Sequence, residues 1–120
     1  MNWPLFLAMI AALETGGEEY PDSAIGKDGE IGRYQITAIF VRDVNRFAGT
    51  RFVHADARDP DKAASMVRIW HGYYGASDTR MIGMARRHNG GPDGYTESCT
   101  LEYGLRAARW IVDNAGKGLK

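Results

Sequence analysis

Apolar residues recur at helical spacing in five segments of the chain, and this pattern predicts five helices. The first helix is expected to begin after Asn2, a good capping residue, with Pro4 in its first turn, and to end near Glu14-Thr15. A threonine, an Asp-Pro pair and several glycines mark the ends of the other helices. These four helices are expected over residues 37–48, 60–74, 78–89 and 100–114.

The same spacing predicts which side chains of each helix face the core. The expected buried positions are Trp3, Leu7 and Ile10; Phe40, Val41, Val44 and Phe47/Ala48; Ala63, Met66/Val67, Trp70 and Tyr73/Tyr74; Ile82 and Ala85; and Leu101, Leu105, Ala108 and Ile111/Val112. Gly104 lies within the last helix, where glycine costs about 1 kcal/mol relative to alanine. We therefore expect another part of the molecule to approach the chain closely at Gly104.

Turn-forming residues are dense between the first two helices, over residues 16–30. The Asp28-Gly29 pair is typical of a hairpin turn, and Ile31, Tyr34 and Ile36 could supply short strands. The expected fold is therefore mainly α, of the α+β type, with about five helices and one small irregular β-hairpin after the first helix. We expect residues 1–120 to form a single domain, with 115–120 as a frayed tail.

The charge and cysteine content limit the classes of function. Lys and Arg total 15 and so do Asp and Glu, so the molecule has no overall field to hold a polyanion, and nucleic-acid binding is not expected. Cys99 is the sole cysteine, which rules out an internal disulfide. We expect a monomer with no cofactor and no metal, since His54, Asp56, His71 and His88 do not follow a metal-ligand spacing.

The apolar segment 3–13 could be mistaken for a signal peptide or a membrane span. No Lys or Arg precedes it and Glu14 interrupts the small-residue cleavage pattern, so no export signal is expected. The segment is also too short to cross a bilayer.

Glu14 is the strongest candidate for chemistry. At 100° per residue, Trp3, Leu7, Ile10 and Glu14 lie within about 40° of one another on one helix face. Burial favours the protonated carboxyl group, which is the form that a general acid needs. The alternative is an ordinary helix-end glutamate that turns to solvent where the helix unwinds at Gly16.

Two amides accompany this acid. Gln35 stands between apolar neighbours after a pair of glycines, and Asn89 ends the fourth helix just before Gly90-Gly91. Two amides and one acid aimed at a common interior suit a saccharide cleft, because amides match the acetamido and hydroxyl groups of sugars. The alternative is that each amide binds the local backbone at a turn.

Taken together and in order, these motifs resemble the lysozyme-like superfamily, in particular soluble lytic transglycosylases and goose-type lysozymes. The family pattern is a helix ending in Glu-Ser, then Gly-Leu-Met-Gln-hydrophobic, then Ala-Tyr-Asn-x-Gly, with Thr and Tyr in a final helix. This sequence has Glu14-Thr15, then Gly32-Arg33-Tyr34-Gln35-Ile36, then Arg87-His88-Asn89-Gly90-Gly91, and finally Thr100 and Tyr103. The resemblance covers nearly the whole chain and implies a lysozyme-like fold.

The resemblance also implies roles for individual residues. Glu14 would be the catalytic acid, Gln35 and Asn89 substrate contacts, and Tyr103 a cleft residue. Arg33-Tyr34 replaces Leu-Met, which makes the cleft floor more polar and could set Tyr34 against a sugar face. Thr15 replaces serine and His88 replaces tyrosine, so the details of the substrate subsite and of the product chemistry differ from the family pattern.

The implied reaction is cleavage of the β-1,4 bond between N-acetylmuramic acid and N-acetylglucosamine in peptidoglycan. A lytic transglycosylase needs one carboxylate, whereas a hydrolase usually needs a second. Glu30 is the favoured second group, with Asp22 and Asp28 as the other candidates. Such an enzyme would act at the bacterial cell wall, for instance as a phage lysin or as the wall-opening enzyme of a secretion apparatus. The competing hypotheses are a non-catalytic saccharide-binding or structural module and a chitin- or chitosan-cleaving glycosidase.

Overall fold

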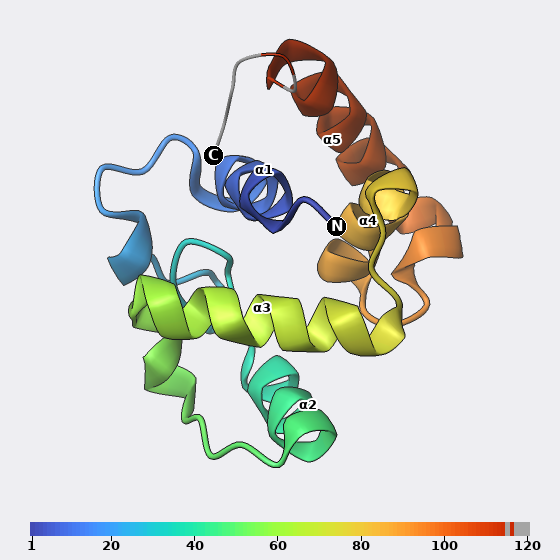
Figure 1. Ribbon diagram of the computed structural model, residues 1–120. Coiled ribbons are helices and arrows are strands. Elements are labelled where there is room, and N and C mark those ends of the chain that lie inside the picture. Colours follow the sequence, from blue (N-terminus) through green and yellow to red (C-terminus); the bar gives the residue numbers. More distant parts are fainter. Residues whose placement is uncertain (115, 117–120) are drawn as a thin grey trace. The chain divides into compact units, whose positions relative to one another are not determined.

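The computed structural model describes residues 1–114 and 116, and in them the helical prediction is confirmed (Figure 1). The helices are α1 (Trp3–Thr15), α2 (Ala38–Ala48), α3 (Pro60–Tyr74), α4 (Met81–Gly90) and α5 (Leu101–Asn114). Short 3-10 turns precede or connect them: η1 (Pro21–Ser23), η2 (His54–Arg58), η3 (Asp78–Arg80), η4 (Gly94–Thr96) and η5 (Ser98–Thr100). The tail predicted at 115–120 lies outside the described residues except for Gly116.

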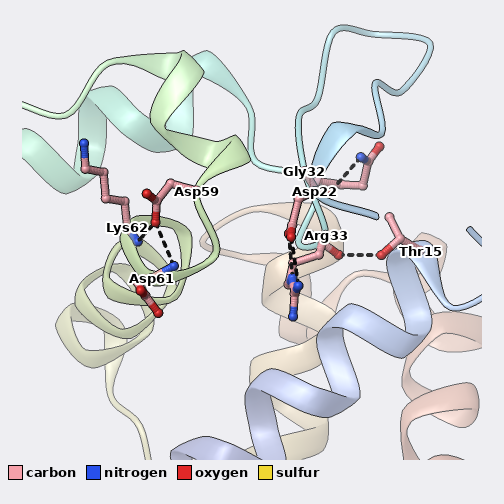
Figure 2. A network of polar contacts seen from close by, with 8 residues as sticks. Thr15, Asp22, Gly32, Arg33, Asp59, Asp61 and Lys62 are labelled. Atoms are coloured by element: carbon pink, nitrogen blue, oxygen red, sulfur yellow. Dashed lines mark hydrogen bonds and ion pairs between the residues drawn. The ribbon is translucent and has the colours of Figure 1, made fainter. Parts of the chain in front are cut away.

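The helices begin where the capping signals indicate, because each cap satisfies backbone N–H groups that the first turn leaves unbonded. Asn2 Oδ1 accepts from the Leu5 N–H at 3.1 Å. Thr37 Oγ1 accepts from the Phe40 N–H at 3.1 Å, also as a cap. Asp59 caps α3 by accepting from the N–H groups of Asp61 and Lys62 at 2.9 and 3.0 Å (Figure 2).

The predicted β-hairpin is wrong. Among the described residues, antiparallel pairing is limited to two isolated bridges, Ile25 with Ile31 and Ile31 with Ile36. Ile31 and Ile36 exchange backbone hydrogen bonds of 3.0 and 2.9 Å, and between them the Gln35 N–H already donates to the Gly32 carbonyl at 3.0 Å. Because the chain turns again directly after each paired residue, no ladder can extend into a strand.

The chain divides into two compact units. The first unit comprises Met1–Leu13 and the chain from Tyr74 onward, and the second comprises Glu14–Tyr73. The division falls inside α1, so Glu14 and Thr15 belong to the second unit.

The core of the second unit gathers apolar side chains from α2, α3 and the bridge region. The rings of Phe40 and Trp70 stack at 4.9 Å between centroids. The predicted inward position of Tyr73 is wrong: Tyr73 is 63% exposed and stacks on Phe47, while His71 is fully buried. The buried stripe of α3 therefore ends one residue after Trp70. Its members are Ala63, Met66, Val67, Trp70 and His71.

The first unit shows the largest departures from the predicted inward faces. In α1 the fully buried residues are Phe6, Met9 and Ile10, whereas Trp3 and Leu7 are half-buried. Ile82 of α4 is exposed, and its neighbours Met81 and Met84 are buried. In α5, Leu101, Leu105 and Val112 are exposed, and Ala108 and Ile111 are half-buried. The buried residues of that helix are Tyr103, Gly104 and Ala107.

Close packing against α4 explains why α5 buries a different face from the predicted one. A Cβ atom on Gly104 would lie 2.9 Å from Cδ and 3.0 Å from Cγ of Arg86. The close approach predicted at Gly104 is therefore confirmed. Small residues at positions 104 and 107 let the two helices come together, and this contact decides which face of α5 is buried.

Candidate functional site

Glu14 lies in the last turn of α1 and is half-buried. The next residue, Thr15, is 6% exposed, and its Oγ1 donates a 3.0 Å hydrogen bond to the carbonyl oxygen of Arg33 (Figure 2). This bond ties the helix end that carries Glu14 to the loop that carries Gln35. Both residues belong to the second unit.

Arg33 also binds Asp22, a pairing that the sequence analysis missed. Arg33 Nε lies 2.6 Å from Asp22 Oδ1, and Arg33 Nη2 lies 2.9 Å from Oδ2, so the guanidinium engages both carboxylate oxygens (Figure 2). These hydrogen bonds hold the pKa of Asp22 below its ordinary value, although burial opposes the shift. Asp22 is therefore ionised near neutral pH and committed to Arg33, which fits a positioning role better than proton transfer.

Gln35 has a strained backbone and a structural use for its amide. Its φ is 51°, in the left-handed region that residues other than glycine rarely occupy. Gln35 Nε2 donates to the Gly32 carbonyl at 2.9 Å and to the Ala24 carbonyl at 3.4 Å. The amide nitrogen thus stabilises the local loop, which is the alternative weighed from the sequence, and Oε1 is the atom left for a ligand.

Glu30 is bound into the turn that precedes it. Its Oε1 accepts from the Asp28 N–H at 2.8 Å, and its side chain is half-buried while Asp28 is exposed. A Cβ atom on Gly26 would lie 2.6 Å from both Glu30 Oε2 and Gln35 Oε1. Because residue 26 is a glycine, the Glu30 carboxylate and the Gln35 amide oxygen can both lie against its backbone.

The remaining predicted contacts differ in accessibility. Tyr34 is 5% exposed, and burial raises the pKa of its phenol. Tyr103 is 7% exposed, with the Arg106 guanidinium carbon 5.9 Å from the centre of its ring. Asn89 is exposed near the end of α4. Glu14, Glu30, Tyr34 and Gln35 are together in the second unit, and Asn89 and Tyr103 are in the first.

In residues 1–114 and 116, no three His, Cys, Asp or Glu side chains gather closely enough to hold a metal ion. None of the described helices is both long enough and apolar enough to cross a membrane.

The fold is similar to that of a lysozyme. The chain is similar to a solved structure, the lysozyme of Tapes japonica, with a TM-score of 0.68 and 24% sequence identity over 97% of this chain and 94% of that one. No protein-family model and no curated protein matches the chain. The likeness establishes a lysozyme-like fold and nothing more specific.

Proposed function

We propose that the protein is a glycosidase-type enzyme that cleaves the β-1,4 bond between N-acetylmuramic acid and N-acetylglucosamine in peptidoglycan, as a muramidase or a lytic transglycosylase. The observation that carries the proposal is the position of Glu14, half-buried at the end of the first helix of a lysozyme-like fold. Half-burial leaves a carboxyl group accessible to substrate while removing part of its hydration, which suits a general acid.

In the first step, protonated Glu14 donates its proton to the glycosidic oxygen, and the bond to the anomeric carbon breaks. In a lytic transglycosylase, the Glu14 carboxylate then removes the proton of the muramyl 6-hydroxyl, and that oxygen closes on the anomeric carbon as a 1,6-anhydro ring. In a hydrolase, a water molecule attacks instead, and a second carboxylate positions it or forms a covalent intermediate.

Two hydrogen-bonding patterns favour the single-carboxylate route. Asp22 is engaged by Arg33 through both oxygens, and one oxygen of Glu30 is engaged by the Asp28 N–H. Glu30 remains the proposed second group for hydrolysis, because its other oxygen shares the space at Gly26 with Gln35.

The proposed substrate contacts are polar atoms that remain available to a ligand. Gln35 would accept a hydrogen bond through Oε1, and the exposed Asn89 amide would bind an acetamido or hydroxyl group. Tyr34 and Tyr103 are nearly buried, so we propose that each supports the substrate contact in its own unit. The enzyme would act as a single-domain monomer at the bacterial cell wall.

The test is mass spectrometry of muropeptides released from purified peptidoglycan by the wild type and by Glu14→Gln. The matched control is Glu18→Gln, which removes an exposed carboxyl group from the turn that follows α1. We expect release that depends on Glu14 and not on Glu18. A product one water lighter than the hydrolytic product identifies a lytic transglycosylase, and a reducing-end product identifies a muramidase.

Two results would contradict the proposal. Equal release by the wild type and Glu14→Gln would remove Glu14 from the chemistry. No release from several wall types would leave a saccharide-binding module, or a chitin- or chitosan-cleaving enzyme if defined oligosaccharides of those polymers are cut.

A further inference from the structure

A cavity of about 650 Å³ lies entirely within the first unit. We call it the arginine pocket, and the residues that matter for its chemistry are Tyr74, Thr79, Arg80, Gly83, Arg87 and Tyr95. Its volume falls within the range of about 300–1,000 Å³ that is usual for sites that bind small molecules. The lining residues bring two cations and no carboxylate, so the chemistry of the pocket favours an anion.

Arg87 is held in place on several sides. Its Nη1 donates to the Tyr74 carbonyl at 3.0 Å and its Nε donates to the Pro92 carbonyl at 3.2 Å. The guanidinium carbon lies 5.4 Å from the ring centre of Tyr74 and 4.8 Å from that of Tyr95, both within cation–π range. A guanidinium fixed in this way loses little freedom when it binds, which raises affinity for a planar anion.

Arg80 supplies the second cation. Its side chain is exposed, and within the described part of the chain no hydrogen bond or ion pair engages its guanidinium. The nearest acid in sequence, Asp78, is already used, because it binds the backbone N–H of Asn2 and the amino terminus. Arg80 is therefore available to a ligand that Arg87 has oriented.

Gly83 helps to keep the space between the two cations open. It lines the pocket on α4, three residues after Arg80 and four before Arg87. A Cβ atom there would meet Tyr95 Cβ at 3.9 Å, which is an ordinary contact. Larger side chains would project into the cavity.

We propose that the arginine pocket binds a carboxylate of the acidic stem peptide of peptidoglycan. This identity of the ligand rests on the proposed function. The glycan repeat offers mainly neutral acetamido and hydroxyl groups, whereas the stem carries carboxylates, which pair with the planar fork of arginine in a two-point geometry. The rings of Tyr74 and Tyr95 provide an apolar surface for the aliphatic part of the peptide.

The first experiment measures binding without catalysis. The probe is the synthetic tripeptide L-Ala-γ-D-Glu-L-Lys, titrated by calorimetry into the wild type, Arg80→Glu and the control Arg42→Glu. Arg42 is an exposed arginine on α2 in the second unit. We expect Arg80→Glu to weaken binding by about tenfold or more, because a charge-assisted hydrogen bond is lost and a repulsion is gained. Arg42→Glu should bind like the wild type.

Two controls define the ligand chemistry. The same tripeptide with its carboxylates converted to amides should bind about tenfold more weakly or worse, since the loss of charge removes the contact with the arginines. Inorganic phosphate at equal concentration should not compete. Equal binding of the amidated peptide, displacement by phosphate, or no effect of Arg80→Glu would overturn the proposal.

A second experiment separates this proposal from the proposed function. Cleavage by the wild type and Arg80→Gln is compared on intact peptidoglycan and on glycan whose stems an amidase has removed and whose newly exposed lactyl carboxylates have been converted to amides. We expect Arg80→Gln to raise KM on the intact substrate and to leave cleavage of the stem-free glycan unchanged. Tripeptide binding without cleavage of either substrate would refute the proposed function and keep the pocket assignment. Cleavage without tripeptide binding would support the proposed function and refute the pocket assignment.

Discussion

The hydroxyl of Thr15 donates a 3.0 Å hydrogen bond to the carbonyl oxygen of Arg33, and Thr15 itself is almost fully buried. This bond joins the end of α1, which carries Glu14, to the loop that carries Gln35. Since a one-ångström displacement of a reacting group can lower a rate by orders of magnitude, a fixed helix end matters for the proposed acid. Thr15 and Arg33 are positioning residues in this scheme.

Thr15→Val tests that bond. Valine keeps the shape of threonine and removes the donor, so the Arg33 carbonyl loses its partner at a partly buried site, at a cost of about 1 kcal/mol. Urea unfolding of the variant should show this loss, and muropeptide release should fall at temperatures where the variant is folded. Thr15→Ser keeps the donor and should restore release. Wild-type release by Thr15→Val would show that the bond does not position Glu14.

Stability in acid should depend on the pair of Asp22 and Arg33. Arg33 lowers the pKa of Asp22 below the ordinary carboxyl value of about 3.9. A group with a lowered folded-state pKa contributes stability above its unfolded pKa, and the contribution is lost as the pH falls through the folded value. The side chains of Arg33 and Asp22 are 35% and 33% exposed, so after solvent screening we expect the pair to contribute about 1 kcal/mol to stability at pH 7.

Asp22→Asn removes this contribution and tests it. The free energy of unfolding of the wild type and the variant should differ at pH 7 and converge towards pH 2. The control is Asp28→Asn, because Asp28 is an exposed acid of the same loop. The assigned role of the ion pair would be contradicted if the free energies of unfolding of the wild type and Asp22→Asn differed by the same amount from pH 7 to pH 2.

The helix ends could be predicted from sequence because each depends on a few neighbouring residues. Asn2, Thr37 and Asp59 bond to N–H groups two or three positions ahead, and Gly49 ends α2 with a φ of 66°. Such bonds form within a single turn and need no tertiary partner. The position of Glu14 in the last turn of α1 follows from the same local rules, and its catalytic role stays a prediction.

The buried faces and the polar network could not be predicted because they depend on contacts between distant residues. α5 buries its small residues because α4 comes close to Gly104, although its leucines make the more apolar stripe. Arg33 meets Asp22 only after the chain has turned at Ile31 and Gly32, and no spacing rule encodes that pairing. The Asp28-Gly29 turn was identified, but the second turn at residues 32–35 prevents strands from forming.

Gly32 and Gly29 offer a matched test of close approach. Both have positive φ, 82° and 87°, so alanine at either position costs about 1–2 kcal/mol in backbone strain. At Gly32 the added Cβ would also clash with the carbonyl oxygen of Ala57, whereas at Gly29 it would meet nothing within 4 Å. Gly29→Ala should fold with that modest loss, and Gly32→Ala should lose more than about 4 kcal/mol or fail to fold. Equal losses, measured by urea unfolding, would show that the approach of Ala57 is not a real constraint.

Gly104 and Gly72 give the corresponding test inside helices. At Gly72 of α3 a Cβ would meet nothing within 4 Å, so Gly72→Ala should stabilise the protein by about 1 kcal/mol through helix propensity. At Gly104 the Cβ would press on the Arg86 side chain, which donates to Thr100 Oγ1 at 2.9 Å and to the Glu97 carbonyl at 2.7 Å. Displacing Arg86 weakens both bonds, so Gly104→Ala should cost about 1–2 kcal/mol despite its better propensity.

A double-mutant cycle identifies Arg86 as the cause. In an Arg86→Ala background the obstructing Cγ and Cδ atoms are gone, so Gly104→Ala should change from destabilising to stabilising. The four proteins are compared by urea unfolding, with Gly72→Ala added to each background as the control for propensity. Gly72→Ala should have the same effect in both backgrounds, because it has no contact with Arg86. If Gly104→Ala destabilises both backgrounds equally, the close approach involves the Ile82 side chain, whose Cγ2 would lie 3.6 Å from the added Cβ, and not the arginine side chain.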